Sequence, residues 1–219
     1  TLNRYAASLA AVITWAIKRR IAPKGYVHPC RSVERRAEHN ERVRFLTDDE
    51  RTRLLVACRA STWPRLYLLV LMALTTGARK GELLGLKWES IDLVRGEAHV
   101  GLTKNGDPRV LPLVPVVVQE LTTFKGAANA FVFASPRTKD KPFAFESKYL
   151  EALAAARIRG VTFHTLRHSC ASMLAKSGAT LLEIGDLLGH RQLQMTKRYA
   201  HLATGHKAAM VNRLLGDLR

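Results

Sequence analysis

The sequence predicts a mainly α-helical protein with one small antiparallel β-sheet, an α+β fold. Apolar residues recur at helical spacing near the start of the chain and again from Phe145 onward. Residues 91–114 instead alternate with a period of two and are rich in β-branched side chains, which is typical of strands. Residues 105–108, Asn-Gly-Asp-Pro, interrupt this stretch with a hairpin-turn signal. With 219 residues, 47% of them hydrophobic, the chain can bury a core.

The first element is an amphipathic helix over residues 2–21, which Pro23 and Gly25 bring to an end. Residues 22–44 then turn polar and basic without an apolar period, so we expect a linker and a domain boundary near residue 44. Because the chain opens at Thr1 directly in a helical pattern, we expect it to be a fragment of a longer protein.

Three further helices are expected before the sheet. Thr47 and Glu50 have the spacing of a capping box, which predicts a helix start. Residues 66–76 are apolar enough for a helix that is buried on most sides, and Gly77 is expected to end it. A short helix fits residues 80–86.

The sheet is expected to be a hairpin within residues 91–114, with residues 131–133 as a possible third strand. From Phe145 onward four or five short helices are expected. The last forms a helical tail over residues 206–219. Glycines divide this part of the chain at Gly160, Gly178, Gly189 and Gly205.

The charge of the chain points to a polyanionic partner. Lys and Arg number 35 against 18 Asp and Glu, a formal net charge of +17, and basic residues are in excess along the whole chain. Nucleic acid fits better than a membrane surface, because no amphipathic anchor stands out and residues 66–74 are too short to span a bilayer. Three widely spaced cysteines favour reduced thiols, and therefore a cytoplasmic protein.

Several side chains could act together on a phosphodiester. Negative charge builds up on the phosphate oxygens during such a reaction, and the planar fork of arginine can hold two of them. Arg79 follows a predicted helix end, and Glu82 is spaced to orient its guanidinium. His164 and Arg167 lie three residues apart and would share one helix face. Taken alone, the position of Arg79 favours a helix cap or a surface ion pair with Glu82.

His168 follows four residues after His164, but the segment lacks the glutamate of a zinc hydrolase, so neither a metal nor another cofactor is expected. We interpret His168 as a packed or capping residue. Leu188-Gly189-His190 is typical of a helix end that presents His190 at a turn. Tyr199 follows in a basic helical stretch with Lys197 and Arg198, and in isolation would be a packing residue.

The hairpin contributes two more basic candidates. Lys104 precedes the turn, where its ammonium could protonate a departing sugar oxygen, and Arg109 follows the turn as a candidate phosphate contact. Each could equally be a solvated residue of an exposed turn.

Together these segments resemble the tyrosine recombinase family, which includes the phage integrases and the Xer-type and Cre-type recombinases. TGARKGELLGLKW, from Thr76, is similar to the family's first arginine box, and the segment from His164 to His190 to its second box. TKRYAH, from Thr196, resembles the nucleophile box, and KNGDPR, from Lys104, the hairpin that carries the family lysine. The resemblance covers about residues 45–202 and implies the catalytic-domain fold of this family.

The resemblance implies a metal-independent DNA strand transferase. Tyr199 would attack a DNA strand to give a 3′-phosphotyrosyl bond, which a second strand's 5′-hydroxyl would reverse. Lys104 would be the general acid, and Glu82 would support the first arginine. Arg109, Lys197 and Arg198 would contact DNA. The residues that would hold the phosphate or handle protons are Arg79, Arg167, His190 and His164.

The resemblance also implies an organisation and partners. Residues 1–44 would be the last helix of a truncated core-binding domain plus a linker, residues 45–205 the catalytic domain, and residues 206–219 a tail docked on its own domain or on a neighbour. The partner would be double-stranded DNA bearing attachment sites, bound by a homo-tetramer, with room for an accessory DNA-bending protein. Such a protein would be phage-encoded or bacterial, cytoplasmic and nucleoid-associated.

Two other functions remain open at this point. A type IB topoisomerase would use the same nucleophile chemistry only to relax DNA. A non-catalytic regulator would use residues 180–201 as a helix-turn-helix and would need no particular residue at position 199.

Overall fold

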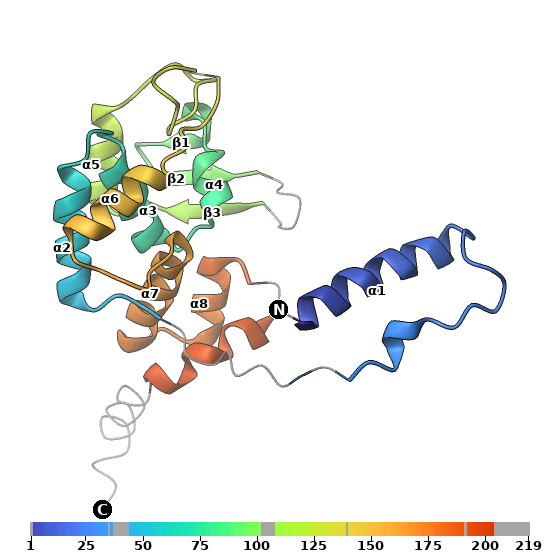
Figure 1. The fold of residues 1–219 in the computed structure, drawn as a ribbon. Helices are drawn as coiled ribbons and strands as arrows, with labels where there is room; N and C mark the ends of the chain where they lie inside the picture. The colour runs from blue at the N-terminus through green and yellow to red at the C-terminus, as the bar shows by residue number, and fades with distance from the viewer. Residues whose placement is uncertain are drawn as a thin grey trace, which may run out of the picture. The chain divides into compact units, whose positions relative to one another are not determined.

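A computed structural model describes residues 2–34, 36, 44–101, 108–138, 140–190 and 192–203. The chain divides into two compact units, Thr1–Glu41 and Arg42–Arg219, each described by itself below (Figure 1). The described residues form helices and one small antiparallel sheet, which confirms the predicted fold class.

The first unit is built on α1 (Leu2–Lys18), followed by the 3₁₀ helix η1 (Pro29–Arg31). His28 holds these two elements together: its Nε2 atom lies 3.1 Å from both Thr14 Oγ1 and the Ala10 carbonyl oxygen. No residue of α1 is buried, and apolar side chains along it are exposed, among them Tyr5 and Trp15.

Part of the expected linker folds back along α1. The Asn3 side chain donates to the Arg36 carbonyl over 2.8 Å and accepts from the Arg36 amide over 3.1 Å. The described part of this stretch is therefore bonded to α1 through Asn3, and the linker up to residue 44 stays a prediction. The helix also ends before the expected residue 21, since Arg20 adopts a left-handed conformation with φ 57°.

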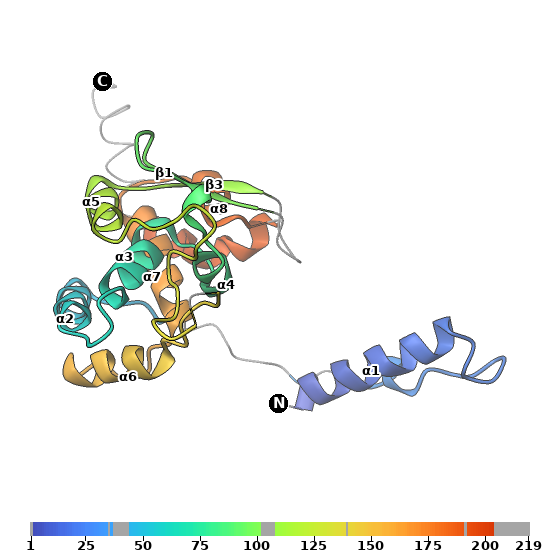
Figure 2. The ribbon, with the colours of Figure 1, turned by 90° about the horizontal axis from the view of Figure 1, so that it is seen from above.

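The helices of the second unit lie around α3, with α2 and α6 to one side and the sheet to the other (Figure 2). Its α-helices are α2 (Asp48–Arg59), α3 (Leu66–Thr76), α4 (Lys80–Leu84), α5 (Pro115–Thr123), α6 (Glu146–Ala155), α7 (Phe163–Lys176) and α8 (Leu181–Leu188).

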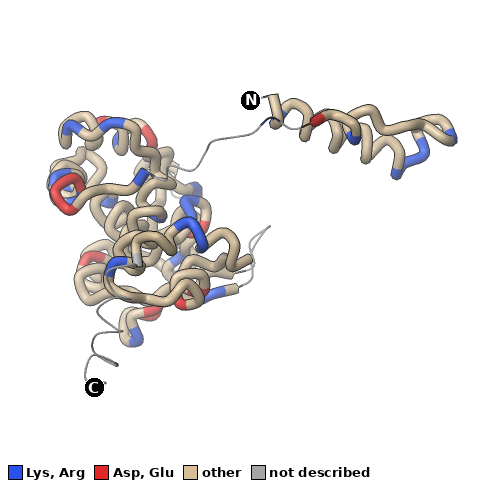
Figure 3. The backbone as a smooth tube through the Cα atoms, turned by 90° about the horizontal axis from the view of Figure 1, so that it is seen from below, with Lys and Arg blue, Asp and Glu red and all other residues tan. Residues whose placement is uncertain are grey.

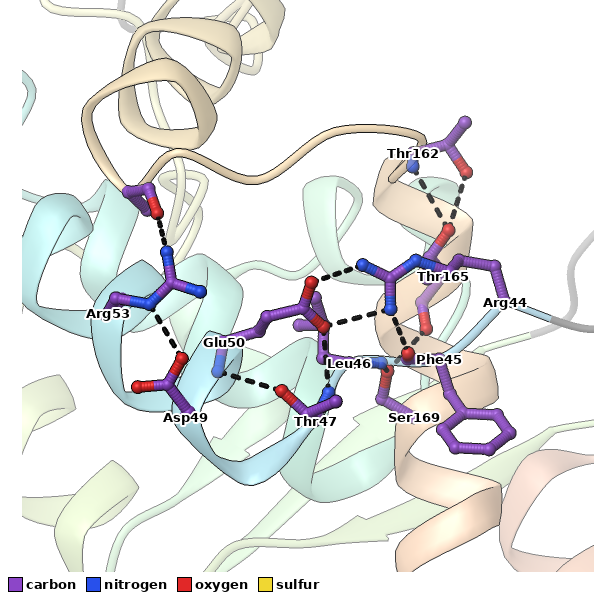
Figure 4. A network of polar contacts seen from close by, with 11 residues as sticks. Arg44, Phe45, Leu46, Thr47, Asp49, Glu50, Arg53, Thr162, Thr165 and Ser169 are labelled. Carbon is purple, nitrogen blue, oxygen red and sulfur yellow. Dashed lines mark hydrogen bonds and ion pairs between the residues drawn. The ribbon is translucent and has the colours of Figure 1, made fainter.

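A polar network fixes the entry of the chain into this unit (Figure 4). The predicted capping box is present: Thr47 Oγ1 accepts from the Glu50 amide over 3.2 Å, and Glu50 accepts from the Thr47 amide over 2.9 Å. Arg44 pairs with the same carboxylate, which lowers the pKa of Glu50 to about 2. The Leu46 amide donates to Ser169 Oγ on α7 over 2.8 Å. The start of α2 is thereby fixed against α7.

The centre of the core is α3, which contacts α2, α5 and α7. Most of its residues are buried, as its apolar sequence predicts. Gly77 ends the helix in the left-handed conformation, with φ 61°, which confirms the predicted end. A Cβ at this position would lie 2.3 Å from Leu188 Cδ2, so only glycine lets α8 come this close.

The sheet has three antiparallel strands in the order β1 (Ile91–Asp92), β2 (Glu97–Val100) and β3 (Arg109–Pro112). Val100 pairs with Arg109, so the predicted hairpin is confirmed, although residues 102–107 of its turn lie outside the described residues.

The expected third strand at residues 131–133 is wrong. Its backbone bonds to the chain after α4, because the Val132 amide donates to the Leu86 carbonyl over 2.9 Å, and Val132 and Phe133 are fully buried. Phe131 makes only an isolated bridge, with Lys87. The strand that completes the sheet is β1.

After α6 the described part of the chain forms α7, α8 and the 3₁₀ helices η3 (Leu193–Met195) and η4 (Lys197–Ala203). Gly189 ends α8 in the left-handed conformation, with φ 65°. Within the described part of residues 180–201, no second α-helix follows α8, so the helix-turn-helix interpretation is not supported. The predicted tail over residues 206–219 lies outside the described residues.

None of the helices in the described ranges has the length and apolar character that crossing a membrane requires.

Candidate active site

The first part of the site is a carboxylate shared by two arginines. Arg79 directly precedes α4, and its guanidinium lies 2.9 Å from Glu82 Oε1, while its amide donates to Glu82 Oε2 over 2.8 Å. Arg109, on β3, lies 2.6 Å from Glu82 Oε2. Burial opposes ionisation of Glu82, but its bonds to these residues hold its pKa below the ordinary value. The expectation that Glu82 orients the Arg79 guanidinium agrees with this geometry.

The same two arginines contact the end of α8. Arg79 donates to the Gly189 carbonyl over 3.1 Å, and Arg109 donates to the Leu187 carbonyl. The last carbonyls of a helix lack partners within the helix and carry partial negative charge, so guanidinium groups stabilise them. The bonds of Arg79 and Arg109 thus join the start of α4, strand β3 and the turn after α8, although these segments are far apart in the sequence.

Arg167 extends the cluster from α7. Its side chain is buried and donates to the Gly77 carbonyl over 2.8 Å, at the turn that precedes Arg79. Burial, together with the neighbouring charges of Arg79 and Arg109, lowers the pKa of Arg167 to about 10. It still carries its positive charge at neutral pH. Two like charges held close together in this way favour an anion between them.

His190 lies at the turn after α8, as predicted, and is held on both sides. Its amide donates to the Gly185 carbonyl over 2.8 Å, and its Nδ1 atom lies 2.8 Å from Oγ1 of Thr196, a fully buried residue. Burial and the neighbouring arginines, Arg167 first among them, lower the pKa of His190 to about 4. Its ring is therefore neutral at neutral pH, and the contact with Thr196 fixes its orientation.

His164 lies one turn before Arg167 on α7, as the spacing predicts. Burial and the positive charges of Arg167, Arg79 and Arg198 lower its pKa. It also lines a cavity of about 510 Å³ with Arg167, Lys80 and apolar residues of α6.

Tyr199, on η4, is 2% exposed, and its hydroxyl lies 2.6 Å from His168 Nδ1. Burial raises the pKa of Tyr199, while the nearby charges of Arg198 and Arg167 oppose the rise. The expected helical stretch around Tyr199 is thus a 3₁₀ helix that turns the phenol inward, toward α7.

The remaining predicted residues fall into three groups. Lys197 and Arg198 are exposed on η4, where they can meet a ligand. Lys104 lies outside the described residues. Arg109 is predicted as a phosphate contact, with a solvated turn residue as the alternative; its side chain is 13% exposed, and its terminal nitrogens bond to Glu82 Oε2 and the Leu187 carbonyl. The structure gives Arg109 a supporting position, and its DNA contact stays a prediction.

Two contacts of the site were missed. The sequence indicates a packing or capping role for His168, yet its ring contacts the Tyr199 hydroxyl, and no signal in the sequence links the two residues, which are 31 positions apart. Thr196 lies in the TKRYAH segment that carried the resemblance, so a signal existed, but its bond to His190 depends on the turn between them. Within the described ranges, no group of three His, Cys, Asp or Glu residues could hold a metal ion.

Comparisons with known proteins agree with this arrangement. Residues 44–206 match the phage integrase family. The shufflon-specific DNA recombinase of Escherichia coli is 34% identical over 176 residues, which cover 80% of this chain and 44% of that protein. The type 1 fimbriae regulatory protein FimE of Escherichia coli K12 is 34% identical over 71% of this chain and 84% of that protein. The catalytic domain of bacteriophage HP1 integrase superimposes with a TM-score of 0.64 at 27% identity, covering 81% of this chain and 99% of that domain.

The fold is that of the catalytic domain of a tyrosine recombinase. The chain belongs to the phage integrase family. The matched stretch spans less than half the length of the shufflon recombinase.

Proposed function

We propose that this chain contains the catalytic domain of a site-specific DNA recombinase, in which Tyr199 forms a covalent bond with the 3′ phosphate of a DNA strand. The observation that carries the proposal is the convergence of Arg79, Arg167 and His190 with Tyr199 in one unit, from four separate segments. Arg79 and Arg167 lie far from each other and from the segment of His190 and Tyr199 in the sequence, and the fold brings them together.

The arginines act as a clamp for the scissile phosphate. Arg79 is half-exposed and keeps donor capacity toward solvent, while Arg167 is buried behind it. Fixed guanidinium groups neutralise the charge that develops on the phosphate oxygens in the transition state. Because their partners within the protein already hold them in place, little reorganisation is needed during the reaction. His190 donates a further hydrogen bond to the phosphate from Nε2, since Thr196 occupies Nδ1.

The phenol of Tyr199 attacks the phosphorus, and the 5′ oxygen of the next nucleotide leaves. Lys104 protonates that oxygen; in the sequence it shortly precedes β3, the strand from which Arg109 reaches the cluster. His164 orients the phosphate. The ester keeps the energy of the broken bond, so a 5′-hydroxyl of another strand can reverse the step. The names of the relatives favour recombination over simple relaxation of DNA, because two of them are a recombinase and an integrase.

The partners and organisation follow from the same function. Lys197 and Arg198 bind the backbone of the duplex beside the scissile phosphate, and Lys and Arg are spread over the whole catalytic unit (Figure 3). The protein assembles as a tetramer on paired sites in cytoplasmic DNA, with an accessory DNA-bending protein where the sites require one. In this proposal α1 is a helix of a core-binding domain, followed by a linker up to residue 44, because α1 has exposed apolar side chains and no buried residue.

The test is covalent capture. The chain is incubated with a pool of radiolabelled duplexes that carry random sequence and a nick, so that the short fragment released by cleavage is lost and the adduct accumulates. We expect an SDS-resistant protein–DNA adduct that Tyr199→Phe abolishes. Tyr67→Phe, a matched variant outside the cluster, should form the adduct normally.

Two results would contradict the proposal: an adduct that survives Tyr199→Phe, or no adduct with the unaltered chain on any duplex of the pool. A paired-site assay on captured sequences, run beside relaxation of supercoiled DNA, distinguishes strand exchange from topoisomerase activity.

A further inference from the structure

The Tyr199 hydroxyl already has a partner that could accept its proton. Tyr199 Oη and His168 Nδ1 are 2.6 Å apart, with ring centroids 6.1 Å apart. This is a short hydrogen bond between a buried phenol and a half-buried imidazole. A general base must lie within hydrogen-bond distance of the group whose proton it takes, and His168 Nδ1 does. Among the described residues, no other hydrogen bond to the Tyr199 hydroxyl occurs.

The charges around His168 keep its ring neutral when no DNA is bound. His164 and Arg167 face it from α7, and Arg198 faces it from η4, beside Tyr199. Burial first, and then these groups, lower the pKa of His168 to about 4. A neutral imidazole has one free lone pair, so Nδ1 can accept from the phenol when Nε2 carries the hydrogen.

His164 is less suited to this task in the structure. Its ring stands edge-on to His168, with centroids 4.7 Å apart and planes at 89°, and it also lines the neighbouring cavity beside Arg167. The direct partner of the Tyr199 hydroxyl is therefore His168 and not His164. The two histidines occupy different positions, one toward the phosphate clamp and one against the nucleophile.

We propose that His168 is the general base of the reaction: it takes the proton of the Tyr199 phenol as the tyrosine attacks DNA and returns that proton when the strand is rejoined. This inference rests on the proposed function. It adds a catalytic group to the six carried over from the family resemblance, and it rests on the direct contact with the reacting oxygen.

The step balances without a further reactant. As the bond from Tyr199 Oη to phosphorus forms, the Oη–H bond breaks and its proton moves to Nδ1. The bond from phosphorus to the 5′ oxygen breaks, and that oxygen receives its own proton from the general acid. In the reverse step a 5′-hydroxyl attacks the phosphotyrosyl bond, and the phenol oxygen leaves and recovers the proton from His168.

Substrate binding should make His168 a stronger base. Part of its weak basicity is due to the positive charges of Arg198 and Arg167. A phosphate held by Arg167 brings negative charge next to these groups, which favours the imidazolium form. The phenol therefore stays protonated in the free protein and loses its proton only when a scissile phosphate is in place.

The test measures single-turnover adduct formation across a range of pH, on a nicked duplex first selected from the random pool by the unaltered chain. His168→Gln keeps an acceptor near Tyr199 but cannot take a proton. His99→Gln, on the exposed side of β2, is the matched control. Thermal unfolding of His168→Gln, and the second variant His168→Asn, show whether a lower rate is caused by loss of the folded structure.

We expect His168→Gln to slow adduct formation by about 100-fold or more, the usual contribution of a general base. Its rate should keep rising with pH, because hydroxide must then remove the proton, whereas the rate of the unaltered chain levels off. Imidazole added to His168→Gly should restore part of the rate. His99→Gln should behave as the unaltered chain.

Three results would overturn the inference. His168→Gln could react at the unaltered rate with an unchanged pH profile, which would make the contact structural. It could react faster, which would mean that His168 restrains the tyrosine. A slower rate with an unchanged pH profile and no rescue by imidazole would indicate positioning alone. If the unaltered chain and His99→Gln form no adduct either, the proposed function itself fails, and this inference with it.

Discussion

Arg79 and Arg167 carry the same charge in very different surroundings. The side chain of Arg79 is 38% exposed and is shared between Glu82 and the Gly189 carbonyl. Arg167 is 4% exposed and is fixed on the Gly77 carbonyl. The first can therefore be changed with little effect on packing, whereas any change to the second disturbs the core. Arg79 is the better position for testing the phosphate clamp.

At this position we predict that Arg79→Lys lowers the rate of adduct formation by about 100-fold or more. A lysine ammonium is a point charge and cannot hold Glu82, Gly189 and a phosphate oxygen in one plane as a guanidinium does. The melting temperature should change little, because the side chain is partly exposed. A variant that folds normally and reacts at the unaltered rate would remove Arg79 from the clamp.

The neutral histidines make stability depend on pH. The pKa values of His168 and His190 are lowered from 6.5 to about 4 in the folded chain. Below pH 6.5 the unfolded chain binds protons at these positions that the folded chain does not, so stability is lost as the pH falls from 6.5 toward 4. Above pH 6.5 both histidines are neutral in the folded and in the unfolded chain, so this loss of stability is absent.

We therefore predict that the free energy of unfolding, measured by denaturant titration, falls over this acid range. The free energy of unfolding of the double variant His168→Gln, His190→Gln should fall less steeply. The control is His99→Gln, whose side chain is 53% exposed. Equal slopes for the double variant and the unaltered chain would show that these two histidines are not held neutral by the fold.

The turn after α8 connects the elements of the site. Gly189 has φ 65°, and a Cβ there would lie 3.0 Å from Arg109 Cδ. The same residue provides the carbonyl that Arg79 binds, and it precedes His190. A side chain at this position would strain the left-handed backbone and would also clash with the side chain of Arg109.

We predict that Gly189→Ala lowers both stability and the rate of adduct formation. Gly160→Ala is a matched control, because Gly160 has φ 69° but nothing within 4 Å of a Cβ. The control should lose about 1 kcal/mol to the left-handed backbone alone, measured by denaturant titration. Gly189→Ala should lose clearly more. Equal losses in the two variants would mean that Arg109 moves aside without cost.

Local signals explain which elements were predictable. The capping box at Thr47 and the glycine ends at Gly77 and Gly189 depend on a few neighbouring residues, and all are present as predicted. Residues 131–133 were misassigned because an apolar, β-prone run fits a buried segment as well as a strand. Contacts such as that of His168 with Tyr199 depend on how distant elements pack, so no local pattern reveals them.

At the scale of the whole molecule, charge governs the encounter with DNA. The formal net charge is +17, and Lys and Arg recur along the described backbone instead of being confined to one segment (Figure 3). Binding to duplex DNA should release counterions, so the affinity should fall steeply with salt. The sequence of the duplex should matter less for this dependence than the number of phosphates contacted.

We predict that the chain alone binds duplex DNA weakly and that its affinity drops more than about tenfold between low and physiological salt. Filter binding or fluorescence anisotropy at a series of salt concentrations measures this. Lys197→Ala with Arg198→Ala should reduce the slope of affinity against salt. A nanomolar affinity that stays flat across the series would contradict this electrostatic account.

The central claim is that the Tyr199 phenol becomes esterified to DNA. The most direct measurement digests the captured protein–DNA adduct with nuclease and protease and locates the remaining nucleotide by mass spectrometry. We predict one modified peptide, with the nucleotide joined through its 3′ phosphate to Tyr199. A nucleotide joined to any other residue, or a linkage through a 5′ phosphate, would contradict the account.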